Sequence, residues 1–155
     1  MEKAVWEFQH SVECDATRQH AWKYWADIAN WDDPPARFHL DGPFAAGSRL
    51  TTVLPGQTLN SLIRDLKPER EATIEMQLHQ ATLSFHWKFE ELSKERARIT
   101  QRLTLDGPNA QSFVAQASVL EETVPDGMKK LAEAIQRSSC SEQVRAQGNL
   151  TWNSQ

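Results

Sequence analysis

The chain has 155 residues, with 17 Lys and Arg against 21 Asp and Glu, which gives a formal net charge of −4. A chain of this length suits one domain with an apolar core. The acidic excess argues against binding to nucleic acid or to an anionic membrane, because both attract an excess of positive charge. The sequence has neither an apolar run long enough to span a membrane nor a basic and then apolar N-terminus, so we expect a cytoplasmic protein without a membrane span or signal peptide.

The spacing of cysteine and histidine gives no sign of a metal site. Cys14 and Cys140 lie far apart and outside any Cys-x-x-Cys pair, which favours two reduced thiols over a disulfide or a zinc site. No pair of histidines has the i, i+4 helical spacing typical of zinc ligands; the five are His10, His20, His39, His79 and His86. We therefore expect neither a metal nor a cofactor.

The first predicted elements are a strand and a short helical region. Apolar and polar side chains alternate over residues 5–13, which is typical of a half-buried strand, and His10 falls on the apolar face together with Trp6. Apolar residues then recur at helical spacing over residues 21–29, and a Pro-Pro pair follows. The pattern predicts a short amphipathic helix that ends before the prolines.

Five further strands are predicted from alternating side chains. They cover residues 49–53, 58–66, 72–78, 83–89 and 97–105. The last two are expected to form a hairpin, because a short polar segment joins them. A register that keeps both apolar faces together pairs Trp87 with Ile99 and Phe85 with Gln101.

One long helix is predicted after the strands. Apolar residues between positions 113 and 135 recur at steps of three or four, which predicts a helix over residues 110–137. Pro125 and Gly127 lie inside it. Because proline lacks an amide N–H and clashes with the preceding turn, we expect a kink over residues 121–127.

The sequence divides into one domain and a tail. Residues 139–155 are polar and aperiodic apart from Val144, Leu150 and Trp152, which predicts a loosely ordered C-terminal segment. The preceding residues 1–138 are expected to form a single domain.

Four stretches, in this order, carry a resemblance to a known superfamily. They are VECDATRQHAWKYWADIANW, LDGPFAAGSRL, ATLSFHWKFEELSKERARITQRLTLDGP and VPDGMKKLAEAI. Over residues 4–137 the chain resembles the START-like helix-grip (SRPBCC) superfamily, and within it the polyketide cyclase/dehydrase-like branch. The resemblance implies an α+β fold: a curved antiparallel sheet of six or seven strands wraps around a long kinked C-terminal helix, with two short helices after the first strand. It also implies an apolar cavity between sheet and helix.

Candidate binding residues follow from the inward-facing positions of such a fold. His10 and Gln101 are the polar side chains that the strand phases turn inward, and a few polar groups in an apolar cavity are how proteins orient small ligands. The apolar candidates are Phe85, Trp87, Phe113 and Leu120. For each candidate the alternative is a structural role: a hydrogen-bonded core residue for His10 and Gln101, and plain core packing for the apolar residues.

A second aromatic group gathers around the short helices. It comprises Trp22, Tyr24, Trp25, Trp31 and Phe38. We expect these side chains to pack as a plug at one end of the cavity rather than to contact a ligand.

Three functions remain open from the sequence. The first is binding of a small hydrophobic molecule, aromatic, lipid-like or polyketide-like. The second is a cyclase- or dehydratase-like enzyme in which His10 acts as general acid or base beside Gln101. The third is a protein–protein interaction module, with the chain a monomer or a homodimer, for which the alternating charges on the outer sheet face offer a surface.

Overall fold

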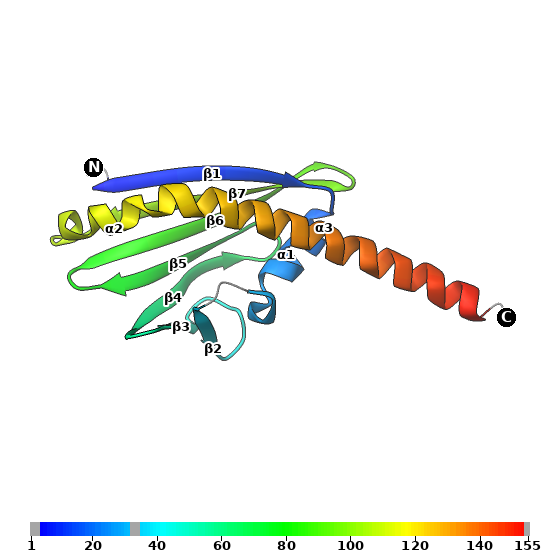
Figure 1. The fold of residues 1–155 in the computed structure, drawn as a ribbon, viewed down its shortest axis with the longest axis horizontal. Coiled ribbons are helices and arrows are strands. Elements are labelled where there is room, and N and C mark those ends of the chain that lie inside the picture. The colour runs from blue at the N-terminus through cyan, green and yellow to red at the C-terminus, as the bar shows by residue number, and fades with distance from the viewer. Residues whose placement is uncertain (1–3, 32–34, 154–155) are drawn as a thin grey trace.

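The computed structural model describes residues 4–31 and 35–153, and it describes side chains as far as residue 140. The strands are β1 (Trp6–Cys14), β2 (Arg37–Asp41), β3 (Arg49–Leu54), β4 (Gln57–Lys67), β5 (Glu71–Leu78), β6 (Ala81–Ser93) and β7 (Arg96–Asp106). The helices are α1 (Arg18–Trp25), η1 (Ile28–Asn30), η2 (Ala110–Phe113), α2 (Val114–Ser118) and α3 (Leu120–Asn153). These elements make an α+β helix-grip fold (Figure 1), which confirms the predicted fold class.

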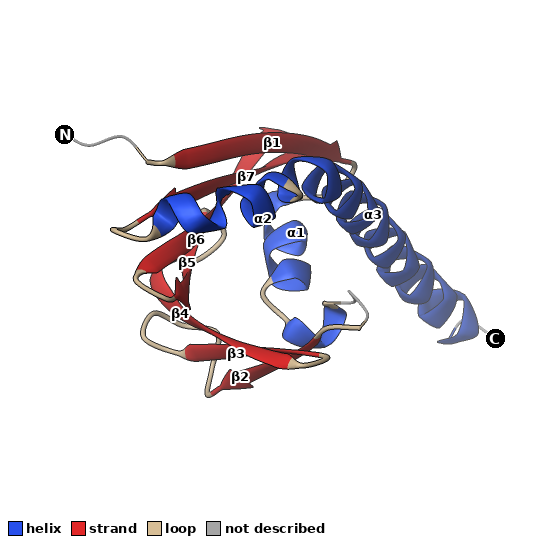
Figure 2. Cartoon of the chain, turned by 60° about the vertical axis from the view of Figure 1, so that its left-hand side comes forward, coloured by secondary structure: helices blue, strands red, loops and turns tan. Residues whose placement is uncertain are grey.

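The seven strands form one antiparallel sheet in the order β1-β7-β6-β5-β4-β3-β2. Figure 2 shows that the sheet curves strongly, with the helices on its concave side. The first strand, β1, forms one edge of the sheet and pairs with the last strand, β7, while β2 forms the other edge. The last helix, α3, packs mainly along β1 rather than across the middle of the sheet.

Side-chain caps explain where the short helices begin. Thr17 precedes α1, and its hydroxyl accepts a hydrogen bond from the backbone N–H of His20 at 3.0 Å. Asp27 precedes η1, and its carboxylate accepts from the backbone N–H of Ala29 at 3.0 Å. Each cap satisfies an amide that the first turn of a helix leaves unpaired. The two short helices predicted after the first strand are therefore confirmed.

The predicted register of the last hairpin was wrong by two residues. Trp87 pairs with Gln101 and Phe85 with Leu103, while Ile99 lies opposite Phe89. The reason is the length of β6, which continues to Ser93 through an irregularity after Glu91, so the turn lies farther along the chain than predicted. A shift of two residues keeps every side chain on its predicted face, so the inward assignment of Gln101 is unaffected.

The C-terminal helical region is also divided differently from the prediction. The single helix predicted over residues 110–137 is three segments, and the interruption lies at Val119, not at Pro125, which is inside α3. The carbonyl of Val119 accepts from the amides of both Glu122 at 3.1 Å and Thr123 at 3.2 Å, so the turn is tightened there. Farther on, α3 continues as a helix through residues 139–153 and extends past the sheet (Figure 1), where the sequence predicted a loose tail. A domain boundary at residue 138 stays a prediction.

Two hydrogen bonds attach α3 to β1. Near the start of the helix, the indole N–H of Trp6 donates to the Glu121 carboxylate at 2.8 Å. Farther along, the side-chain oxygen of Gln136 accepts from the backbone N–H of Asp15 at 2.8 Å. The helix is thus held along the edge strand at two separate points.

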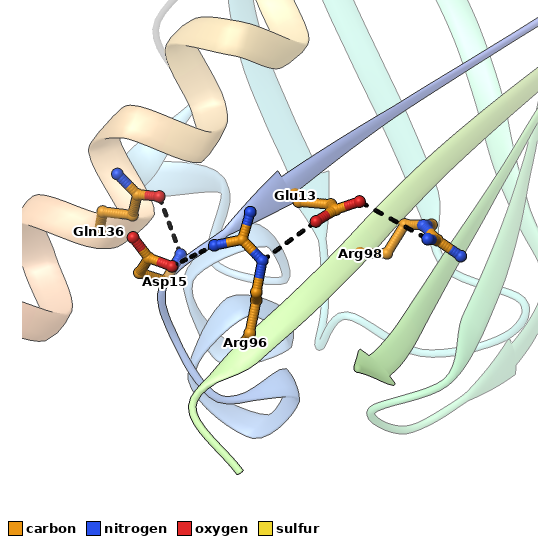
Figure 3. A network of polar contacts seen from close by, with 5 residues as sticks. All are labelled: Glu13, Asp15, Arg96, Arg98 and Gln136. Carbon is orange, nitrogen blue, oxygen red and sulfur yellow. Dashed lines mark hydrogen bonds and ion pairs between the residues drawn. The ribbon is translucent and has the colours of Figure 1, made fainter. Parts of the chain in front are cut away.

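An ion-pair network reinforces the second attachment point (Figure 3). Arg96, at the start of β7, donates to Glu13 at 3.0 Å and to Asp15. Arg98 lies 3.5 Å from the other oxygen of Glu13. These side chains are on the outer surface, where ion pairs add little to the free energy of unfolding. Their role is to fix the positions of Glu13 and Asp15 beside β7.

None of the helices in the described part of the chain is long and apolar enough to span a membrane.

Candidate binding face of the curved sheet

The concave face of the sheet is filled at its two ends by separate apolar clusters. The first, which we call the α1 cluster, contains Trp22 and Trp25 of α1, Phe89 of β6 and Ile135 of α3. The second, which we call the α2 cluster, contains Trp6, Leu83, Leu103, Leu105 and Ala117. Phe85 and Val124 are only partly buried and contact both clusters. The middle of the concave face therefore lies where two packed cores meet.

The α1 cluster is an aromatic plug of the kind predicted. Trp25 is 2% exposed, and its ring lies 5.1–6.1 Å from the rings of five other aromatic residues. These five are Trp22, Trp31, Phe44, Trp87 and Phe89. Trp31 in turn contacts Phe38 of β2 at 5.2 Å, and its indole N–H donates to the Trp25 carbonyl at 2.6 Å. Contacts of this kind add to the large apolar area that each ring buries.

His10 and Gln101 lie next to each other, midway along the two strands β1 and β7 at one edge of the sheet. The β1–β7 register places them directly opposite, and the β6–β7 register places Trp87 on the other side of Gln101. Side chains that lie opposite on adjacent strands have Cβ atoms about 5 Å apart and point to the same face. Two of the predicted polar candidates and one of the aromatic candidates thus form a row across three strands.

Gln101 is 6% exposed, yet its side-chain amide forms no hydrogen bond with any residue that the structure describes. The amide is not among the unpaired polar groups that protein atoms enclose completely, so it retains a small exposed area. A buried amide without a partner costs free energy, on the order of 1–3 kcal/mol. A ligand that hydrogen-bonds to Gln101 would recover that cost.

The other predicted site residues lie around this row. Phe85 is two residues from Trp87 on the same face of β6 and is half-buried. Phe113 of η2 and Leu120 of α3 are half-buried against the α2 cluster, on the helical side of the concave face. Trp87 is half-buried but packs against Trp25 at 5.1 Å, so it forms the border between the plug and the middle of the face.

Two further polar residues on the concave face were not singled out from the sequence. Ser61 of β4 is 5% exposed and Thr52 of β3 is 8% exposed. The alternation did contain the signal, because Ser61 lies between Leu59 and Ile63, which face inward.

No charged side chain from the described strands points to this face between the two clusters. The inward positions of the strands hold apolar residues, the polar residues already named and Cys14. Burial raises the pKa of the Cys14 thiol to about 11, and the nearby Asp15 carboxylate adds to the shift. In the described part of the chain no group of three or more His, Cys, Asp or Glu side chains is placed to hold a metal ion.

Comparison with solved structures finds the same fold in proteins of low sequence identity. A norcoclaurine synthase from Thalictrum flavum, a point mutant in complex with a transition-state analogue, superimposes with a TM-score of 0.68 at 14% identity, over 89% of this chain and 99% of that one. The di-domain ARO/CYC BexL from the BE-7585A biosynthetic pathway gives 0.64 at 16% identity, over 83% of this chain and 46% of that one. A protein from Arthrobacter aurescens gives 0.65 at 17% identity, over 84% of this chain and 86% of that one.

No protein-family model and no curated protein matches the sequence. The solved structures confirm the helix-grip fold that the sequence resemblance predicted, and they include an ARO/CYC of the kind that the polyketide cyclase-like branch implies. At these identities the likeness concerns the fold alone.

Proposed function

We propose that the chain binds a small, hydrophobic aromatic molecule on the concave face of the sheet. The observation that carries this proposal is the Gln101 amide beside His10, which is buried, keeps a small exposed area and lacks a partner among the described residues. Its apolar neighbours on this face are the half-buried Trp87 and the fully buried Ile99 and Leu103. An apolar surface with a few polar groups is the usual character of a small-molecule site. The ligand contacts are His10, Phe85, Trp87, Gln101, Phe113 and Leu120.

The comparisons support the same ligand class. One structure of the norcoclaurine synthase with this fold is a complex with dopamine and hydroxybenzaldehyde, which are both small aromatic molecules. That enzyme is only 13% identical to this chain, so the support concerns the class of molecule and not its identity.

Binding is tested with 4-hydroxystilbene, 2-naphthol and flavone as probes, by calorimetry and by quenching of tryptophan fluorescence. We expect at least one probe to bind with a Kd below about 100 μM. Replacing Gln101 with Leu should weaken binding about three- to tenfold, because one hydrogen bond between neutral groups is lost. The matched control is Gln9→Leu, since Gln9 is exposed on the outer face of β1.

The proposal is overturned if none of the probes binds the wild-type protein, or if Gln101→Leu and Gln9→Leu have the same affinity as wild type. Circular dichroism of each variant shows whether the fold is retained.

The position of His10 favours a second candidate, an acid–base enzyme of the cyclase or dehydratase type. His10 lies opposite Gln101 and is half-buried, so its imidazole has an amide beside it that orients a carbonyl oxygen. A positioned acid or base contributes roughly 10²–10⁴-fold to a rate.

The enzyme candidate is tested by proton exchange at the carbons next to the carbonyl of 2-tetralone, followed by NMR in D₂O. The wild-type protein should accelerate the exchange, and His10→Gln should abolish the acceleration. His79→Gln is the control, because His79 is exposed in the turn between β5 and β6. Equal exchange with and without the wild-type protein would eliminate acid–base catalysis on this ketone and leave binding as the function.

A further inference from the structure

The buried polar residues of the described chain fall at two separate places. Only three polar residues there are buried: Gln101 at 6%, Ser61 at 5% and Thr52 at 8% exposure. Gln101 belongs to the row with His10 at one side of the concave face. Ser61 and Thr52 lie on β4 and β3, toward the other edge of the sheet.

Ser61 and Thr52 are neighbours on the same face. Ser61 pairs with Leu50, and Thr52 is two residues beyond Leu50 on β3. Such a diagonal pair has Cα atoms about 7–8 Å apart, which is close enough for both hydroxyls to contact one group of a ligand. Neither hydroxyl forms a hydrogen bond with any described residue, and neither is completely enclosed by protein atoms.

The distance between the two polar places follows from the sheet geometry. Pairing runs from Ser61 to Met76, Leu83 and Leu105, so Ser61 lies three strands away from β7. Three strand spacings are about 14 Å, and the four residues from Leu105 to Gln101 add about 13 Å along the strand. Gln101 and the hydroxyl pair therefore lie well apart on the concave face, with apolar side chains of β5 and β6 between them.

The charge on this face also limits the ligand. The inward strand positions between the two places carry no Asp, Glu, Lys or Arg. A charged ligand group would lose its hydration without meeting an opposite charge at the hydroxyl pair.

We propose that the hydroxyl pair of Ser61 and Thr52 is a second anchor of the binding face. The ligand is then an elongated, uncharged aromatic molecule with a hydroxyl or carbonyl group at each end. One end hydrogen-bonds to Gln101, and the other end hydrogen-bonds to the hydroxyl pair. This inference rests on the proposed function and specifies its ligand class.

The test compares four stilbenes of similar shape: trans-stilbene, 4-hydroxystilbene, 4,4′-dihydroxystilbene and stilbene-4-carboxylate. With the wild-type protein, each hydroxyl should tighten binding about three- to tenfold, since each adds one hydrogen bond to a group that lacks a partner. The carboxylate should bind more than tenfold more weakly than 4-hydroxystilbene, because its charge is desolvated without compensation.

The decisive variant is the double substitution Ser61→Ala and Thr52→Val, which removes both hydroxyls and nearly preserves the shapes of the side chains. It should erase the advantage of the dihydroxy compound over the monohydroxy compound and leave the affinity for 4-hydroxystilbene within about twofold of wild type. The matched control is Ser84→Ala with Thr51→Val, because both residues are on the outer face of the same sheet. This control should keep the wild-type order of affinities.

The outcomes separate the two proposals. If the wild-type protein binds none of the stilbenes, the proposed function fails together with this inference. If it binds the mono- and dihydroxy compounds equally, or binds the carboxylate as tightly as 4-hydroxystilbene, the second anchor is overturned while ligand binding stands. Loss of the dihydroxy advantage in the outer-face control would also overturn it.

Discussion

Phe89 and Phe85 lie on the same face of β6, four residues apart, and have very different surroundings. Phe89 is 2% exposed, and its ring contacts Trp22 at 5.2 Å and Trp25 at 5.4 Å. Phe85 is half-buried between the two clusters and has no aromatic ring contact among the described residues. One strand thus serves both as core and as the lining of an accessible face.

The difference comes from the helices and not from the strand. The short helix α1 contacts β6 at the Phe89 end and fills the curve of the sheet there with two tryptophans. At the Phe85 end, α3 keeps mainly to β1, and the helical residues that pack there belong to the α2 cluster, which brings no aromatic ring into contact with Phe85. Whether an aromatic residue on this sheet is fully buried or half-buried therefore depends on which helix packs over it, and its own type does not decide.

The largest expected effect of a substitution on stability is in the α1 cluster, at the Phe89 end of β6. Phe89→Ala should lower the free energy of unfolding by about 3–5 kcal/mol, because a fully buried ring leaves a cavity among rigid aromatic neighbours. Chemical denaturation of the variant and of wild type measures it. A loss below about 1 kcal/mol would mean that the α1 cluster is as loosely packed as the middle of the face.

The packed end should also make the stability depend on alkaline pH through Cys14, which is completely buried. Its folded pKa of about 11 lies above the ordinary value of 9.0, so the folded state holds the thiol proton more tightly than the unfolded state does. The contribution of the protonated Cys14 thiol to the free energy of unfolding is complete below pH 9 and is lost as the pH rises toward 11. Between pH 9 and pH 11 the free energy of unfolding of wild type should fall by about 2–3 kcal/mol more than that of Cys14→Ala.

Thiol labelling gives an independent check on the same residue. At pH 8 only roughly one Cys14 thiol in a thousand is ionised at that pKa, and the thiolate is the reactive form. Iodoacetamide should therefore modify Cys140, which is exposed, and leave Cys14 intact in the folded protein. Equal labelling of both thiols, or parallel pH curves for wild type and Cys14→Ala, would contradict the buried environment.

Truncating Phe85, at the other end of β6, should lower the stability less than truncating Phe89. Phe85→Ala is expected to cost about 1–2 kcal/mol, since its half-buried ring removes less apolar area from water than the ring of Phe89 does. The same variant should weaken the binding of 4-hydroxystilbene more than Phe89→Leu, a conservative change at the packed end. If Phe85→Ala destabilises as much as Phe89→Ala, the two ends of β6 are equally packed and the comparison fails.

Much of this fold could be predicted from the period-2 alternation, and the failures have physical causes. Six of the seven strands were predicted because apolar residues alternate on one face, but β2 was missed, since five residues after a Pro-Pro pair give too short a pattern. The hairpin register was wrong because a bulge does not change the alternation of the apolar residues that flank it. The helical backbone beyond residue 138 was missed because its sequence is polar and shows no apolar stripe.

Part of the candidate site could be predicted, because the alternation determines which face of the sheet a side chain lies on. Alternation places Gln101 and His10 inward, and the register error of two residues left that unchanged. What the sequence did not reveal is that Gln101 has no partner, because pairing depends on residues far apart in the chain. For Trp87 the sequence left ligand contact and core packing open, and its packing against Trp25 depends on where α1 docks.

The smallest expected effect is on stability at Gln101 itself. A core glutamine with partners would lose hydrogen bonds on replacement by Leu and destabilise the fold, whereas an unpaired amide loses nothing and its replacement adds apolar burial. Gln101→Leu should therefore leave the free energy of unfolding within about 1 kcal/mol of wild type, or raise it, while it weakens ligand binding. Denaturation and calorimetry on the same preparation measure the two quantities together. A loss of 2 kcal/mol or more, on the order of a broken buried hydrogen bond, would assign Gln101 to the core and remove the anchor from the proposed site.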